Sequence, residues 1–215
     1  MTQPRADAQA AQAGGIQAVS ATSRAEAPAV AQTLPADAQS EQTNGSAIVS
    51  PGGERHREHR WEDPAIAAAA ARDMDGMTFF GEILAGRLPP PPIAATLGFD
   101  LVSVEKGRVV FGLTPAEFHY NPIGSVHGGV YATLCDSACG CAVHSMLPAG
   151  AFYTSLDLAT RFIRPVTADT GRLLCEGTVS HLGSRTAVAH ARLTDAAGKL
   201  YAEATSSCMI FRPER

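Results

Sequence analysis

One carboxylate stands alone in the middle of this sequence. Between Glu117 and Asp157 lie 39 residues with a single formally charged side chain, Asp136. The segment around it is largely apolar, and burying an unpaired carboxylate costs on the order of several kcal/mol. Such groups find a hydrogen-bond donor or shift their pKa, and they concentrate at functional sites. Asp136 is therefore a candidate base or nucleophile; the alternative is a solvent-facing aspartate, or one bonded to nearby backbone.

The loop before Asp136 collects polar side chains and two adjacent glycines. Asn121, Ser125 and His127 lead directly into Gly128 and Gly129. Free N–H groups at a helix N-terminus favour negative charge, and glycine lets a ligand approach the backbone closely. An N–H from Gly128 or Gly129 is thus a candidate oxyanion donor. The alternatives are ordinary turn chemistry for the glycines and a capping role for His127.

A long helix is expected to carry Asp136. Residues 130–147 lack an internal proline and place Val130, Leu134 and Ala138 near helical spacing. Extended stretches flank this helix, at 98–106 and 108–116 before it and at 153–165, 171–183, 184–198 and 200–213 after it. The helix is apolar nearly all round, which requires an antiparallel sheet that curls about it. The pattern predicts an α+β fold.

The sequence divides into three parts. Residues 1–60 contain no Phe, Tyr or Trp and are rich in Ala and Gln, so we expect a disordered tail whose removal leaves activity nearly unchanged. Residues 61–92 read as a helical segment of one or two helices that ends at the run Pro89–Pro92. Residues 93–215 form the predicted main domain.

Composition excludes several classes of protein. The formal net charge is −4, and no basic face suited to nucleic acid is evident. No run approaches the roughly 20 apolar residues needed to cross a bilayer, and the N-terminus lacks a secretory signal pattern. Five cysteines, an odd number, indicate reduced thiols in a soluble cytoplasmic protein.

Two clusters could suggest other chemistry. Cys135, Cys139, Cys141 and His144 invite a zinc site or a Cys141–His144 nucleophile pair, but side chains two apart on a helix point in different directions. His56 and His59 lie in a mixed-charge patch that offers weak support for a metal site. Buried structural thiols and no metal are the preferred interpretation.

The motif from Asn121 to Asp136 resembles a known family. The spacing Asn121-Pro-Ile-Gly-Ser-Val-His127-Gly128-Gly129, with Asp136 nine residues after the histidine, is similar to that of hotdog-fold acyl-CoA thioesterases of the PaaI type, related to 4-hydroxybenzoyl-CoA thioesterase. Ser155-Leu-Asp-Leu and Arg161-Phe-Ile-Arg-Pro165 extend the likeness, which covers about residues 75–213. The resemblance implies a long central helix wrapped by an antiparallel sheet of about six strands.

The resemblance also implies roles for individual residues in thioester hydrolysis. Asp136 would activate water or attack the carbonyl, and Gly128 would donate the oxyanion-hole N–H. Asn121 would orient the carbonyl or the water, and His127 would support the loop. Ser155 would position the water, with Thr154 as its possible substitute. The implied substrate-binding residues are Gly129, Thr154, Arg161, Arg164 and Arg185, of which the arginines would meet the phosphates of coenzyme A.

The same family implies how the protein assembles and what else it could do. A homodimer or a dimer of dimers would place the active site between subunits. No metal and no cofactor would be needed, because coenzyme A is part of the substrate. Because one fold serves several reactions, an enoyl or hydroxyacyl thioester hydratase-dehydratase and a non-catalytic acyl-CoA-binding protein remain the alternatives.

Overall fold

The computed structural model describes residues 48–49 and 53–212. The predicted tail therefore falls mostly outside the described residues, except for Ile48–Val49 and residues 53–60. Strands β1 (Ile48–Val49) and β2 (Arg55–His56) pair antiparallel, with Ile48 opposite His56. Within the described part, no helix is long and apolar enough to span a membrane.

Within the described residues, three short helices precede the main sheet. Helix α1 (Pro64–Asp73) is capped by Asp63, and α2 (Gly76–Leu84) is capped by Asp75, whose carboxylate accepts from the N–H groups of Met77 and Thr78. Helix α2 ends before the proline run, and the last proline of that run begins a helix that the sequence did not suggest, α3 (Pro92–Leu97). Proline favours the first helical turn, where its missing N–H costs nothing.

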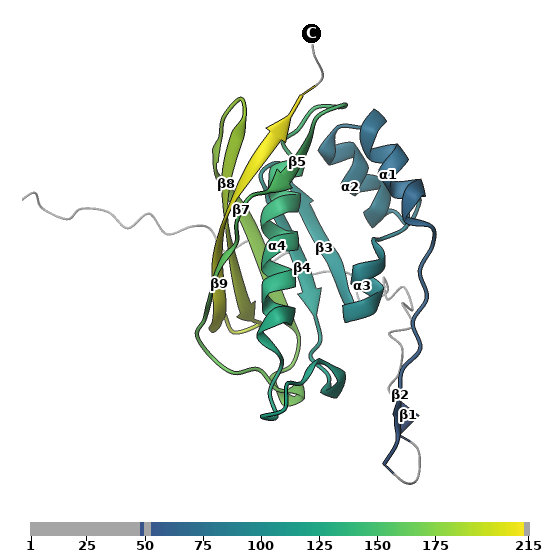
Figure 1. Ribbon diagram of the computed structural model, residues 1–215, viewed down its shortest axis with the longest axis vertical. Helices are drawn as coiled ribbons and strands as arrows, with labels where there is room; N and C mark the ends of the chain where they lie inside the picture. The colour runs from purple at the N-terminus through teal and green to yellow at the C-terminus, as the bar shows by residue number, and fades with distance from the viewer. Residues whose placement is uncertain (1–47, 50–52, 213–215) are drawn as a thin grey trace, which may run out of the picture. The chain divides into compact units, whose positions relative to one another are not determined.

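A single antiparallel sheet forms most of the domain (Figure 1). Its strands are β3 (Phe99–Glu105), β4 (Arg108–Leu113), β5 (Phe152–Ser155), β6 (Ala159–Phe162), β7 (Leu173–Leu182), β8 (Thr186–Asp195) and β9 (Leu200–Phe211). Their order is β3-β4-β7-β8-β9, after which β5 and β6 both pair with β9. Seven strands thus occupy six positions, which confirms the predicted α+β fold of about six strands.

The strand predicted over 153–165 is broken in two. Asp157 lies between β5 and β6. Its carboxylate accepts from the Ser207 N–H at 2.9 Å, and its backbone carbonyl accepts from the Ser206 hydroxyl at 2.8 Å. These contacts replace regular ladder bonds with β9. The break separates Ser155, at the end of β5, from the arginines that follow it.

Helix α4 (Gly128–His144) lies across the concave side of the sheet and packs against β4, β7, β8 and β9 (Figure 1). Gly177 on β7 permits a close approach of the helix to the sheet, because a Cβ there would come within 2.1 Å of the Ala138 carbonyl oxygen. The helix starts two residues earlier than predicted and ends three earlier. Two short 3-10 helices, η1 (Glu117–His119) and η2 (Ala168–Thr170), lie in the connections.

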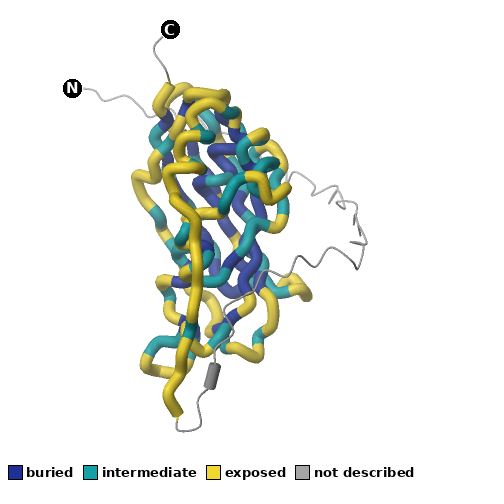
Figure 2. Tube along the Cα trace, turned by 90° about the vertical axis from the view of Figure 1, so that its right-hand side faces the viewer, coloured by how far each residue is buried: buried dark blue, intermediate teal, exposed yellow. Residues whose placement is uncertain are grey.

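The core lies between α4 and the sheet, where Figure 2 shows the buried chain. Leu134, Cys135, Cys139, Cys175 and Cys208 are buried there. The sheet curls about α4 as predicted, but as a half-barrel, so one side of the helix is left uncovered. The uncovered stripe consists of Gly129, Ala132, Thr133, Asp136, Ser137 and Cys141, all at least partly exposed.

Candidate active site

His127 caps the N-terminus of α4. Its Nδ1 atom accepts a hydrogen bond from the Gly129 N–H at 2.9 Å, so in the neutral ring the proton resides on Nε2. The Val130 N–H donates to the His127 carbonyl at 2.9 Å. The N–H of Gly128 has no hydrogen-bond partner within the described residues. One free backbone donor therefore stands at the positive end of the helix, where it favours an anion.

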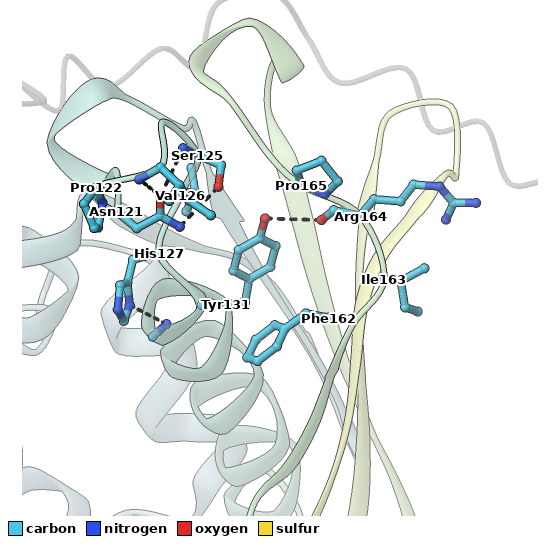
Figure 3. Close-up of a pocket in the computed structure, with 13 residues that line it drawn as sticks. Asn121, Pro122, Ser125, Val126, His127, Tyr131, Phe162, Ile163, Arg164 and Pro165 are labelled. Carbon is cyan, nitrogen blue, oxygen red and sulfur yellow. Dashed lines mark hydrogen bonds between the residues drawn. The ribbon is translucent and has the colours of Figure 1, made fainter.

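Close packing explains why residue 128 is a glycine. A Cβ at this position would come within 3.1 Å of Cζ of Phe162, the last residue of β6. The Phe162 ring also meets Tyr131 edge-on, with 5.7 Å between ring centroids, and the Tyr131 hydroxyl donates to the Arg164 carbonyl at 3.3 Å (Figure 3). Gly128 thus lies beside an aromatic wall formed by Phe162 and Tyr131, two residues within the motifs to which no site role was assigned.

Asn121 shapes the loop before α4. Its carboxamide oxygen accepts from the N–H groups of Ile123 at 3.0 Å and Ser125 at 3.3 Å, and Nδ2 donates to the Ser125 hydroxyl at 3.2 Å (Figure 3). Its backbone N–H donates to the Ser125 carbonyl at 2.8 Å. The side chain is therefore largely occupied in holding a tight turn, and its expected contact with a carbonyl or a water would use the remaining Nδ2 hydrogen.

An open pocket of about 800 Å³ lies beside this loop (Figure 3). It is lined by three groups of residues: Asn121, Pro122, Ile123, Ser125 and Val126 of the loop, His127, Gly128, Gly129 and Tyr131 of the helix start, and Phe162, Ile163, Arg164 and Pro165 after β6. The structure thus brings together four of the predicted site residues, namely Asn121, His127, Gly128 and Gly129, with Arg164 at the rim.

Asp136 lies on the uncovered stripe of α4, and the expectation that it is buried is wrong for the single chain. The Ser155 hydroxyl donates to Oδ1 of Asp136 at 3.0 Å, whereas Oδ2 has no hydrogen-bond partner in the described part of the chain. Of the two predicted candidates on β5, Ser155 makes this contact; Thr154 makes none with Asp136. The structure therefore pairs a carboxylate with a hydroxyl and leaves one carboxylate oxygen accessible.

The two halves of the predicted site do not meet within one chain. Asp136 follows Gly128 by eight residues on the same helix, which corresponds to about 12 Å along its axis. Asp136 does not line the pocket beside the loop. A single carbonyl group cannot contact both the free Gly128 N–H and the Asp136 carboxylate of the same chain.

The three predicted phosphate-binding arginines lie in different surroundings. Arg161 pairs with Glu203 at 3.4 Å, and the Arg164 guanidinium donates to the Leu200 carbonyl and extends away from the loop (Figure 3). Arg185 lies exposed in the turn between β7 and β8, and its side chain has no ion pair within the described residues. Of the three guanidinium groups, that of Arg185 is thus the most available to bind a phosphate.

Two of the cysteines on α4 have thiols whose pKa is raised by burial. Burial raises the pKa of the Cys139 thiol to about 12, and that of Cys141 likewise to about 12. His144 packs edge-on against Phe79 and Phe80, and burial lowers the pKa of its ring. No group of three metal-ligating side chains occurs in the described ranges. The structure gives no support to the zinc site or the nucleophile pair.

Sequence reasoning missed two kinds of residue around the site. Phe162 and Tyr131 pack beside Gly128, whose N–H is free within the described residues. Their only signal in the sequence was their position near predicted site residues. Arg57 contacts the segment that leads into the loop, and it lies in the predicted tail. These contacts join residues far apart in the chain, so spacing alone gives no sign of them.

Known proteins support a common family for this chain. Residues 123–202 match the family model described as "Thioesterase superfamily". A 1,4-dihydroxy-2-naphthoyl-CoA hydrolase of Listeria monocytogenes is 28% identical over 105 residues, which cover 49% of this chain and 84% of the relative.

Solved structures extend the comparison. A phenylacetic acid degradation-related protein of Ralstonia eutropha JMP134 is 30% identical, with a TM-score of 0.55 over 60% of this chain and 98% of that one. The Escherichia coli PaaI protein shares the fold at 23% identity, with a TM-score of 0.55 over 65% of this chain and 96% of its own. The long helix against a curled antiparallel sheet is thus the hotdog fold.

Proposed function

Because the chain belongs to the thioesterase superfamily, we propose that it hydrolyses an acyl-CoA or aryl-CoA thioester to the free acid and coenzyme A. The observation that carries this proposal is the Ser155–Asp136 hydrogen bond, which leaves one oxygen of the carboxylate free on the open side of α4. A base, an oxyanion donor and a hydroxyl that holds water are sufficient for this reaction, because a thiolate leaves with little acid assistance.

In this proposal, each residue of the site has one role in thioester hydrolysis. Asp136 takes a proton from water, which adds to the thioester carbonyl, or its carboxylate adds directly to form an anhydride that water then cleaves. The Gly128 N–H stabilises the charge on the carbonyl oxygen. His127 holds the loop as the cap of α4, and Asn121 holds the turn before it. The products are a carboxylic acid and the coenzyme A thiol.

A second copy of the chain completes the site. Gly128 and Asp136 of one chain are separated by about 12 Å along α4, so each active site combines Asp136 and Ser155 of one subunit with the Gly128 loop of the other. The open sheet edge formed by β5 and β6 exposes Phe152, Leu156 and Phe162. Exposed apolar side chains on an unpaired edge strand favour association. We therefore propose a homodimer, or a dimer of dimers, as the active form.

Arg185 is the first candidate for the phosphates of coenzyme A, with Arg161 and Arg164 as further candidates. The chemistry calls for no metal and for no cofactor, since coenzyme A is carried by the substrate. We infer a cytoplasmic location, because none of the five cysteines forms a disulfide.

Thiol release from a panel of acyl-CoAs tests the function directly. Phenylacetyl-, hydroxybenzoyl-, hexanoyl- and palmitoyl-CoA should be compared with the wild-type protein and Asp136→Asn. Turnover of at least one substrate that depends on Asp136 would support the proposal and rank the acyl groups. Binding of acyl-CoA without hydrolysis would refute it, and hydration of an enoyl-CoA would then separate a hydratase from a binding protein.

A single-turnover reaction in ¹⁸O-labelled water distinguishes the two routes. Direct attack by Asp136 leaves the label in the protein carboxylate after the anhydride is cleaved at that carbonyl, whereas general-base catalysis places it only in the released acid.

A further inference from the structure

The segment from Gly53 to Asp63 is fastened to the elements that precede the loop. The Arg55 side chain pairs with Glu117 of η1 at 2.6 Å. The half-buried guanidinium of Arg57 lies 3.9 Å above the Phe118 ring and donates to the carbonyl groups of Ala95, at 3.0 Å, and Thr96. This segment lies outside residues 123–202, the stretch that matches the family model.

Arg57 and His119 together satisfy the C-terminus of α3. The last carbonyl groups of a helix lack donors within it and carry partial negative charge, so they favour a cation. The Arg57 guanidinium donates to the carbonyl groups of Ala95 and Thr96. His119 Nε2 donates to the carbonyl group of Leu97 at 2.6 Å. Two residues from different parts of the chain thus close one helix end.

His119 continues this chain of contacts into the loop. Its ring is buried and uses both nitrogens, because Nδ1 accepts from the Ala116 N–H at 3.0 Å. Its backbone carbonyl accepts from the His127 N–H at 2.8 Å. His127 is the residue whose side chain caps α4 beside the free Gly128 N–H. Four steps therefore connect Arg57 with the oxyanion donor: Phe118, His119, His127 and Gly128.

We propose that Arg57 is a positioning residue for thioester hydrolysis, which holds η1 against α3 and so fixes His127 and the Gly128 N–H. The inference rests on the proposed function and extends it to residues 53–60, and it replaces the expectation that removal of residues 1–60 leaves activity nearly unchanged, because Arg57 packs against α3 and η1. Arg57 touches no substrate in this account. It acts by keeping the loop in the one arrangement in which the N–H meets the carbonyl oxygen, and a misplacement of about 1 Å at a reacting centre can cost 10²-fold in rate.

The test uses the full-length chain with Arg57→Ala and a control, Glu58→Ala. Glu58 lies on the same segment, is exposed, and within the described residues has only His56 as an ion-pair partner, at 3.4 Å. We expect Arg57→Ala to lower kcat by about five- to fifty-fold while KM changes by less than about twofold. Glu58→Ala should leave both parameters near the wild-type values. Rates are compared at a temperature well below the unfolding transition of both variants.

Hydrogen exchange of the peptide that contains residues 119–129 gives a readout that does not depend on hydrolysis. Arg57→Ala should accelerate exchange there and leave the β7–β8 amides unchanged. Arg57→Lys should fall between the wild type and Arg57→Ala, because an ammonium can bind one carbonyl group but cannot match the planar, two-carbonyl contact and the stacking on Phe118.

The outcomes separate the two claims. Unchanged kcat and unchanged exchange in a folded Arg57→Ala variant would overturn the positioning role even if the protein is a thioesterase. Faster exchange at 119–129 in a protein that hydrolyses no acyl-CoA would refute the proposed function and leave the mechanical link from Arg57 to the loop supported. A fall in Tm with kcat and exchange unchanged would assign Arg57 a purely structural role and would also overturn the inference.

Discussion

Helix α4 has two sides that serve different purposes. The side toward the sheet is closed: Leu134, Cys135, Ala138 and Cys139 are buried. The other side is open and carries Asp136, the charged residue on which the proposed chemistry depends. The comparison teaches that one helix can set the position of a carboxylate by packing while leaving that carboxylate accessible to a substrate.

The largest expected effect is that of Asp136→Asn on the open side. Asparagine keeps the shape and the contact with Ser155 but cannot act as a base or as a carboxylate nucleophile, so kcat should fall by about 10²–10⁴-fold. Thermal unfolding should change little, because the side chain is exposed. Ser137→Ala, one residue further along this side, is the control and should retain activity; full activity in Asp136→Asn would remove this residue from the mechanism.

A slightly smaller effect on kcat is expected from a substitution at Gly128, the first residue of α4. Gly128→Pro removes the free N–H at a position where a helix tolerates proline, and it should lower kcat by about 10²–10³-fold. Gly128→Ala is the matched control, because it retains the N–H and adds a comparable contact with Phe162. Equal losses in both variants would attribute the effect to crowding and would place the oxyanion donor elsewhere.

Ser155 and Thr154 provide a finer test of the open side. Ser155→Ala removes the hydrogen bond to Asp136, and the loss of a hydrogen bond to a charged group, worth about 1.5–3 kcal/mol, corresponds to about 10–10²-fold in kcat. Thr154→Ala should change kcat by less than about twofold. If Thr154→Ala lowers kcat more than Ser155→Ala does, the hydroxyl group that holds the water belongs to Thr154 and not to Ser155.

The buried side of α4, which faces the sheet, should affect the stability of the protein at high pH and should not affect catalysis. Burial raises the pKa of Cys139 to about 12, whereas an unfolded thiol titrates near 8.5. The thiolate therefore forms more readily in the unfolded chain, so this contribution is complete below about pH 8.5 and is lost as the pH rises toward 12.

Urea unfolding measured at pH 8 and pH 10 tests this expectation. The free energy of unfolding should fall by about 1–2 kcal/mol between them on account of this thiol, and by less in Cys139→Ala. An identical decrease in both proteins would show that other groups cause the alkaline loss.

The elements near the motif could be predicted because local patterns determine them. Helical spacing around Leu134 indicated α4, and glycine and proline marked most strand ends. The start of α4 was set two residues late because the capping bond from Gly129 to His127 depends on side-chain geometry. Helix α3 was missed because a proline run reads as a break, although its last proline suits a first helical turn.

The missed features depend on contacts between distant residues. The break at Asp157 follows from bonds to Ser206 and Ser207 some fifty residues away. The capping of α3 by Arg57 joins the predicted tail to the domain. The exposure of Asp136 depends on how far the sheet curls around α4. Hydrophobic periodicity does not encode that curvature, so it indicated a buried helix where one side is open.

The central claim is that each active site combines the Gly128 loop of one subunit with Asp136 of another, and mixing two inactive variants tests it most directly. Asp136→Asn and Gly128→Pro are unfolded together in equal amounts, refolded and assayed for thiol release. In random dimers about half are hybrids, and each hybrid has one intact site, so the mixture should regain about a quarter of the wild-type activity. A mixture that contains hybrid dimers and remains as inactive as the separate variants would contradict a shared site.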